Sequence, residues 1–274
     1  MDKNIIRKYD DGLGAFYGRL APILLLEKLA GKHDLKSLLE LNAVYIAHTP
    51  GFTSNLLTQD NFKAGVLVNS QDYEETVSAW KEAGLYDKAS IVKGDDDTHT
   101  SFKDNEYDIV WNHSVFEKHH NPESLVKEMK RISRRFVVNF TSNYNNLGVK
   151  MHHRHHRLEK KEWDHGEISQ SRIKALTETY KKCGLKIIET GGADVPPWLC
   201  TLDLEIGGGR TYVRNIIEGE EKKEKGWVWS TVDPSARNNK YIKAFLNWES
   251  TFPRWFKVLM AHHVYCIGEK ESGT

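Results

Sequence analysis

The chain has 274 residues, of which 39% are hydrophobic and 28% charged, and its formal net charge is +1. This length is enough to bury a core without disulfides or a structural metal, and the charge balance argues against a dedicated nucleic-acid binder. The most apolar stretch, residues 20–29, contains Pro22, Glu27 and Lys28, so we expect no transmembrane segment. The N-terminus has no apolar signal core, which favours a cytoplasmic protein.

Apolar residues at helical spacing predict a helix over Leu13–Ala30. From residue 36 onward, short apolar runs alternate with amphipathic stretches. The predicted strands are Lys36–Asn42, Ala64–Asn69, Ala89–Lys93, Tyr107–Asn112, Arg134–Phe140, Leu185–Thr190 and His262–Gly268. The predicted helices between strands are Asp72–Gly84, Pro122–Ile132 and Ser171–Gly184. This alternation predicts an α/β fold with a Rossmann-like, doubly wound, mostly parallel seven-stranded sheet and helical cap insertions.

We expect a single domain, residues 1–274. Its core would comprise about residues 34–145, 170–192 and 260–270, and a cap would form from 1–33, 146–169 and 195–259. Sheets of this kind bind ligands at the carboxyl ends of their strands. The cap segments would therefore lie over a ligand site.

Several loop sequences follow these strands in a specific order. They are Gly94-Asp95-Asp96, then Phe102–Asp108 (FKDNEYD), then Ser114–Glu117 (SVFE), then a helix that ends with Glu128–Ile132 (EMKRI). This order resembles the central part of class I S-adenosylmethionine (SAM) dependent methyltransferases of the small-molecule, type 11-like group. The resemblance implies SAM as the cofactor and methyl transfer to a small-molecule or lipid-like acceptor.

The resemblance also implies which residues hold the cofactor, by their places after the strands and in an N-terminal Tyr-Gly-Arg element. These are Tyr17, Arg19, Glu40, Asn42, Gly51, Asn69, Asp95, Asp96 and Asn112. The chain departs from the family at two points. Asn42 and Val44 stand where the turn after the first strand should have glycines, and Asn69 replaces an acid after the second strand. These departures leave open the alternative of a non-catalytic, methyltransferase-like binding protein.

Two histidines are candidates for acceptor-side chemistry, because imidazole titrates near neutral pH. His113 directly follows the fourth predicted strand, and His165 lies in the segment Trp163–Gly166, which resembles an element of small-molecule relatives. Four further histidines lie within residues 152–156, interleaved with Arg154. Their spacing is compatible with a pair of metal ligands, an anion-binding helix face or a solvated helix face. A pair of metal ligands would also be compatible with a metal-dependent hydrolase. Because arginine opposes a cation, we expect no metal site.

Six of the eight tryptophans occur from Trp163 onward, mostly in the expected cap. Together they predict an aromatic-lined acceptor pocket, suited to an aromatic or lipid-like molecule. The His-Arg segment adds an anionic acceptor as a further possibility.

Overall fold

The structure is a computed structural model that describes residues 3–43, 49–58, 62–195 and 228–271. Seven strands form one sheet in the order β3-β2-β1-β4-β5-β7-β6. The strands are β1 (Ser37–Glu40), β2 (Lys63–Val68), β3 (Ala89–Lys93), β4 (Tyr107–His113), β5 (Ser133–Ser142), β6 (Leu185–Ala193) and β7 (His263–Lys270). The pairs among β1–β5 are all parallel, and β7 runs antiparallel between β5 and β6. The predicted α/β fold is therefore confirmed, with all seven strands near their expected places.

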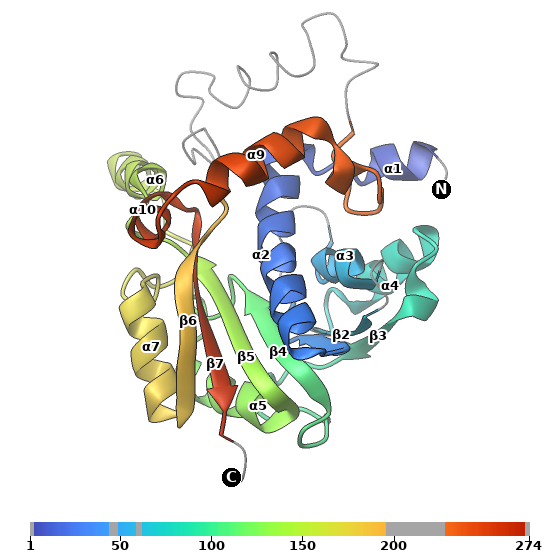
Figure 1. The fold of residues 1–274 in the computed structure, drawn as a ribbon, viewed down its shortest axis with the longest axis horizontal. Helices are drawn as coiled ribbons and strands as arrows, with labels where there is room; N and C mark the ends of the chain where they lie inside the picture. Colours follow the sequence, from blue (N-terminus) through green and yellow to red (C-terminus); the bar gives the residue numbers. More distant parts are fainter. Residues whose placement is uncertain (1–2, 44–48, 59–61, 196–227, 272–274) are drawn as a thin grey trace, which may run out of the picture.

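Helices cover both faces of the sheet (Figure 1). They are α1 (Lys3–Lys8), α2 (Gly12–His33), α3 (Asn55–Thr58), α4 (Tyr73–Glu82), α5 (Pro122–Ile132), α6 (Leu147–Leu158), α7 (Ile173–Lys182), α9 (Lys240–Ser250) and α10 (Arg254–Met260). Helix α5 begins as the sequence predicts, because the Asn121 side chain accepts a hydrogen bond from the Ser124 amide and Pro122 occupies the first turn.

Two apolar clusters fill the space on either side of the sheet. On one face, α2 packs its apolar side chains against residues such as Trp111 of β4 and Phe136 of β5. On the other face, α5 and α7 pack against Val110 and Val137. Helix α2 is thus a layer of the core rather than part of a cap, which differs from the expectation for residues 1–33. Its apolar residues are so numerous that it buries nearly every turn.

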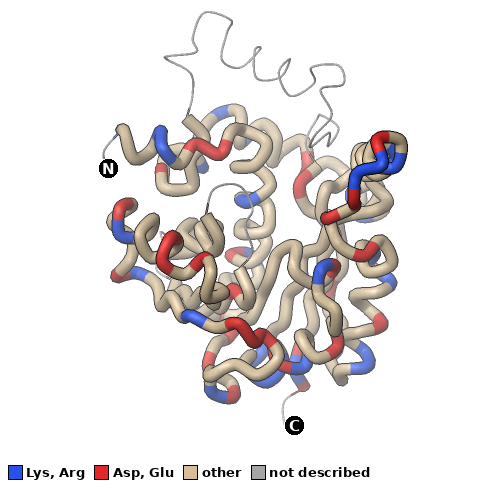
Figure 2. The backbone as a smooth tube through the Cα atoms, turned by 180° about the vertical axis from the view of Figure 1, so that it is seen from behind, with Lys and Arg blue, Asp and Glu red and all other residues tan. Residues whose placement is uncertain are grey.

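The carboxyl ends of the parallel strands meet at the edge beneath α9, at the top of Figure 1. Helix α9 crosses above this edge, and α6 lies at its side. Lysines and arginines are interspersed with acids along the visible backbone, and α6 carries a concentrated set of charges (Figure 2). The sheet edge is therefore the place where ligand chemistry is expected.

The close packing of α10 on β6 gives a first test of the fold. A Cβ added at Gly192 would lie 2.3 Å from the Lys257 carbonyl oxygen, whereas one added at Gly31 in α2 meets nothing within 4 Å. Gly192→Ala is expected to lower the free energy of unfolding by about 1–3 kcal/mol through overpacking. Gly31→Ala, the matched control, should raise it by about 0.5–1 kcal/mol. Urea denaturation measures both, and equal stability of the two variants would contradict the packing of α10.

Candidate active site

The turn after β1 begins with a residue in a conformation that most side chains avoid. Asn42 has φ 51°, and Gly51, beyond the undescribed residues 44–48, has φ 70°. Asparagine tolerates this left-handed region better than most residues, so Asn42 makes the turn without the glycine that the family pattern has there. A Cβ at Gly51 would come within 2.4 Å of Val66 Cγ1, so this position requires glycine.

Asn42 is held by an acid that the sequence analysis did not select. Its Nδ2 donates to Asp97 Oδ2 at 2.7 Å, and His119 Nε2 lies 3.0 Å from Asp97 Oδ1. The hydrogen bond with Asp97 raises the pKa of His119. Asp97 is the third member of the acidic run after β3, and that run was the available signal. Only the turn geometry shows that its third acid, not its second, faces the turn after β1.

The other two acids of this run, Asp95 and Asp96, form hydrogen bonds within the loops after β2 and β3. Asp95 accepts hydrogen bonds from the Ser70 amide at 2.6 Å and hydroxyl at 2.5 Å, which joins the loops after β2 and β3. Asp96 is exposed and accepts from Thr98 and from the amide of His99. Asn69, at the end of β2, donates to Asp72 Oδ2 and accepts from the Asp72 amide, both at 2.8 Å. Asn69 directly follows β2, which lies between β1 and β3, whereas Asp95 and Asp96 follow β3 at the edge of the sheet.

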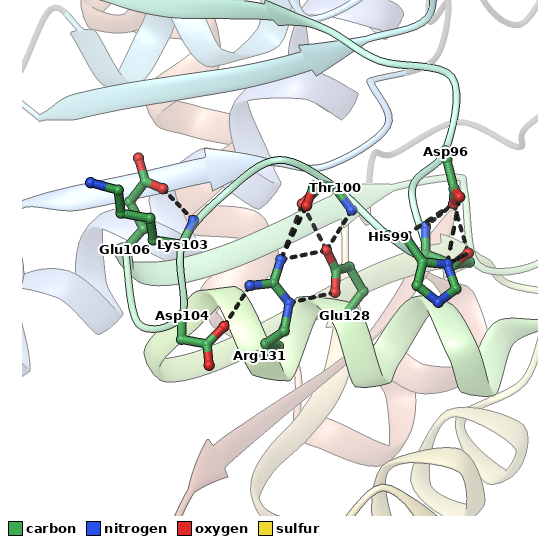
Figure 3. A network of polar contacts seen from close by, with 9 residues as sticks. Asp96, His99, Thr100, Lys103, Asp104, Glu106, Glu128 and Arg131 are labelled. Carbon is green, nitrogen blue, oxygen red and sulfur yellow. Dashed lines mark hydrogen bonds and ion pairs between the residues drawn. The ribbon is translucent and has the colours of Figure 1, made fainter.

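The loop after β3 is fixed to α5 by an ion-pair network (Figure 3). Glu128 accepts from both the amide and the hydroxyl of Thr100 at 2.7 Å. Arg131 donates to both Glu128 oxygens, at 2.8 and 2.7 Å, and to Asp104. A bidentate arginine is the more directional form of such a pair, so this network restrains the loop that carries Asp97.

A buried charged group lies at the end of β1. Glu40 is buried and its Oε2 accepts from the Ser54 hydroxyl at 2.5 Å. Burial raises the pKa of Glu40 to about 7, although Ser54 and the nearby Arg19 guanidinium act in the opposite direction. Arg19 is itself buried and lies 3.3 Å from Asp11. The Arg19–Asp11 ion pair and Glu40 are therefore buried ionisable groups close to the carboxyl end of β1.

Tyr17, two residues before Arg19 in α2, faces a different partner. Its hydroxyl donates to Glu249 Oε2 of α9 at 2.7 Å, and the Val195 amide donates to the same oxygen at 2.9 Å. Burial raises the pKa of Glu249 and of Tyr17. This contact ties α9 to α2, so Tyr17 anchors the helix that crosses the edge.

At the ends of β4, β6 and β7, a group of histidines is enclosed. The ring centroids of His113 and His263 lie 4.3 Å apart, and His262 Nδ1 lies 2.9 Å from Asp194 Oδ2. His113 is 2% exposed, and within the described residues neither of its ring nitrogens has a hydrogen-bond partner. Burial lowers the pKa of His113, with further contributions from His263 and Arg19, and lowers that of His263 to about 4. Both imidazoles are therefore neutral at pH 7.

Asp194, His262 and His263 were not predicted as site residues. The paired histidines directly before the last strand were the available signal, but only the antiparallel placement of β7 brings them beside β4. In the register of the sheet, His263 pairs with both Ser142 of β5 and Ala193 of β6. The antiparallel strand thus delivers its first residue to the edge where the parallel strands end.

Asn112 lies on the opposite face from His113. Its Oδ1 accepts from Asn139 Nδ2 at 2.6 Å, and Asn139 Oδ1 accepts from the Tyr180 hydroxyl at 2.6 Å. These side chains are buried under α5 and α7, near Met129. The cofactor contact of Asn112 stays a prediction from the resemblance. In the structure its side chain lies under α5 and α7, because side chains alternate along β4 and its neighbour Trp111 packs in the cluster that contains α2.

His165 lies in the loop after α6, among aromatic rings rather than alone. Its ring centroid is 4.8 Å from His152, 5.7 Å from His156 and 4.7 Å from Trp163. The structure thus brings His165 together with the histidine-rich helix.

The remaining tryptophans have varied environments: Trp229 is 1% exposed within the core, whereas Trp248 and Trp255 are 47% and 67% exposed. Trp248 and Trp255 therefore do not line an enclosed pocket, and Trp198 and Trp227 lie outside the described residues.

No helix within the described ranges combines the length and apolar character that crossing a bilayer requires.

The fold is similar to those of solved methyltransferases. The magnesium protoporphyrin IX methyltransferase of Synechocystis, solved with bound SAH, has a TM-score of 0.50 at 14% identity over 70% of this chain and 94% of that one. SAM-dependent methyltransferases of Thermotoga maritima (TM-score 0.49, 13% identity, 94% and 92% covered) and Aquifex aeolicus (0.47, 15%, 70% and 93%) are also similar. No curated protein matches the sequence.

The sequence profile of a family described as a methyltransferase domain matches residues 48–135, about a third of the chain. This segment runs from the turn after β1 into β5 and includes the loops after β2, β3 and β4. Fold and profile together support a methyltransferase domain with the class I fold. Together with this fold, the profile match indicates S-adenosylmethionine as the cofactor.

The side chains at the sheet edge fit this cofactor chemically. Amide and carboxylate oxygens at the ends of β1, β2 and β3 can accept hydrogen bonds from the ribose hydroxyls and the adenine amino group. The turn that begins at Asn42 replaces glycine without losing the left-handed backbone.

Asp97 provides a direct test of this edge. Asp97→Asn is expected to weaken SAH binding by about 10-fold or more, because charge-assisted hydrogen bonds contribute roughly 1.5–3 kcal/mol, here to the position of Asn42. Asp96→Asn, which changes an exposed neighbour, should stay within about 2-fold of the unaltered protein. Isothermal titration calorimetry with SAH measures both, and equal affinities would show that Asp97 does not shape the site.

Proposed function

We infer that the protein transfers the methyl group of SAM to a hydroxyl or amino group of a small-molecule or lipid-like acceptor bound beside His113. The observation that carries this inference is the buried imidazole of His113, whose two ring nitrogens have no partner within the described residues. An unsatisfied buried polar group costs roughly 1–3 kcal/mol. An acceptor that donates a hydrogen bond to His113 would remove this cost.

The neutral state of the two histidines defines the kind of acceptor. Because burial lowers the pKa values of His113 and His263, neither offers a positive charge at pH 7. This supports an uncharged O–H or N–H group as the nucleophile, more than an anion. In the reaction, SAM supplies an electrophilic methyl group. A neutral ring nitrogen of His113 would accept the proton that the acceptor atom loses on methylation and would then release it to solvent.

The cofactor side of the site is assigned to residues at the ends of β1 and β2 and in their turns. We assign it to Glu40, Asn42, Gly51 and Asn69, with Arg19 beneath them. Asp95, Asp97 and Tyr17 position this edge through the Ser70, Asn42 and Glu249 contacts.

The test begins with SAH binding by calorimetry and continues with transfer of labelled methyl from SAM to a panel of hydroxylated and aminated small molecules. His113→Gln is expected to lower transfer by about 100-fold or more, in the range of general-base catalysis, while SAH affinity stays nearly constant. His33→Gln, near Phe136 at the opposite end of β5, is the matched control. Absence of SAH binding by the unaltered protein, or full activity of His113→Gln, would refute the proposal.

A further inference from the structure

Three histidines outside the site described above converge on one point. His152 and His156 lie one turn apart on α6, and His165 comes from the loop that follows this helix. One ring nitrogen of each lies within 4.8 Å of the others. His152 and His156 are buried and His165 is partly buried. Two histidines four residues apart on a helix face the same side, which is a recurring arrangement for a metal ion.

The protonation of His156 is set by a backbone carbonyl. His156 Nδ1 lies 2.7 Å from the Glu162 carbonyl oxygen, and a carbonyl can only accept, so Nδ1 carries the proton. The lone pair of His156 is then on Nε2, which lies 2.8 Å from His152 Nε2. Metal-binding histidines usually donate their second nitrogen to a carbonyl or carboxylate in this way. The carbonyl therefore directs the Nε2 lone pair of His156 toward His152.

A tryptophan and the sheet edge hold the loop in place. Trp163 contacts the rings of His152, His156 and His165 with centroid distances of 5.5, 5.5 and 4.7 Å. Its indole Nε1 donates to the Gly166 carbonyl at 2.9 Å. The following amide, that of Glu167, donates to the Glu117 carbonyl at 2.6 Å. The loop that supplies His165 is thus fixed both to α6 and to the chain after β4.

The arginines that argue against a cation in the sequence do not face the histidines. Arg154 and Arg157 are exposed, while His152 and His156 are buried on the other side of α6. An acid lies beside His165, since Asp164 Oδ1 is 3.2 Å from His165 Nε2. The local charge therefore permits a cation where the sequence pattern opposed one.

We propose that His152, His156 and His165 bind a divalent transition-metal ion of the zinc type. Imidazole nitrogen is a preferred ligand of such ions. Tetrahedral zinc with bonds of about 2.0–2.1 Å separates its ligand nitrogens by about 3.3 Å. The three nitrogens need only small movements to reach that spacing. Three protein ligands leave a fourth position for water or another ligand.

The ion would join α6 to the loop 159–166. That loop borders an open pocket of about 480 Å³, lined by Glu117, Lys118, Trp163 and Gly166 among others. Glu117 Oε1 accepts a hydrogen bond from the Ser142 amide at the end of β5, and the Glu117 carbonyl accepts one from the Glu167 amide. A metal bound to His165 would therefore stabilise the position of the loop 159–166 beside the carboxyl end of β5. This inference does not depend on the methyl acceptor.

The experiment is a titration of the metal-free full chain with Zn²⁺ by calorimetry and with Co²⁺ by visible absorption. We expect one equivalent to bind, with a rise in melting temperature. His165→Gln should weaken binding at least about 10-fold, and so should His152→Gln and His156→Gln. His165 is the least buried of the three, so its variant tests the site even if the helix variants fold poorly. His155→Gln is the matched control, because His155 is on the same helix and pairs with Glu159 at 3.1 Å.

Binding of neither ion would overturn the proposal, as would binding that persists in His165→Gln or is lost equally in His155→Gln. Binding of inorganic phosphate or sulfate without Zn²⁺ binding would identify an anion site and also overturn it. SAH affinity, measured in the same variants, should not change. Loss of SAH binding with intact Zn²⁺ binding would therefore count against the methyltransferase proposal alone.

Discussion

Glu40→Gln is expected to stabilise the protein at pH 8 by up to about 3 kcal/mol, and to have little effect near pH 4.5. Burial raises the pKa of Glu40 from 4.5 to about 7, and each pKa unit corresponds to about 1.4 kcal/mol. Since the folded state binds this proton more tightly than the unfolded state, the stabilisation is fully present below pH 4.5. It is lost as the pH rises through 7. Glutamine stays neutral and can still accept from Ser54, so it avoids the loss.

Chemical denaturation of both proteins from pH 4.5 to 8.5 measures the effect as a difference, which cancels the titration of other groups. Glu74→Gln, at an exposed position of α4, is the control and should give a nearly constant difference across this range. A Glu40→Gln difference that does not grow with pH would show that Glu40 titrates normally in the folded protein.

Asn139→Leu is expected to destabilise the protein by about 2–4 kcal/mol, because it removes the centre of a buried network. Asn139 donates to Asn112 at 2.6 Å and accepts from Tyr180 at 2.6 Å, and all three side chains are fully buried. Without Asn139, Asn112 Oδ1 loses this donor, and an unsatisfied buried group costs roughly 1–3 kcal/mol. Tyr180 would retain its hydrogen bond to the Cys266 carbonyl at 3.2 Å.

Tyr180→Phe removes one hydroxyl from the same network and should cost less, about 1–2 kcal/mol. The double variant should cost less than the sum of the two, because the groups share one hydrogen bond. Urea denaturation measures all three proteins. Strict additivity would show that Asn139 and Tyr180 are not coupled. SAH binding should be unaffected, since this network lies beneath α5 and α7 rather than at the cofactor edge.

Much of the fold could be predicted because its signals are local. The helix over 122–132 is marked by Asn121, Pro122 and its periodic apolar residues, and the structure has these bounds. The strand Ala89–Lys93 is likewise found where predicted. Periodicity and capping act within a few residues of the chain, so the sequence is sufficient for them. The predicted helix at 72–84 is shorter in the structure, Tyr73–Glu82, because helix ends depend on the turns that follow.

The site was harder to predict, because it depends on which face of a strand a residue occupies. Asn112 and His113 are adjacent, yet one joins the network under α5 and the other faces α2. Likewise, three consecutive acids follow β3, and only Asp97 reaches Asn42. Alternation along a strand is visible in sequence, but the face that meets a given helix is decided by how the layers pack.

The sequence by itself determined the order of strands and helices along the chain and the resemblance to class I methyltransferases, because local periodicity and a compound motif suffice for these. Tertiary structure alone decided the pairing of His113 with His263, since the antiparallel β7 joins residues 150 positions apart at one edge. It also separated the histidines of α6 from the arginines between them, because helix geometry turns the two sets to opposite sides. The charge balance and the excess of histidine are properties of composition, but which histidines meet is a property of the folded chain.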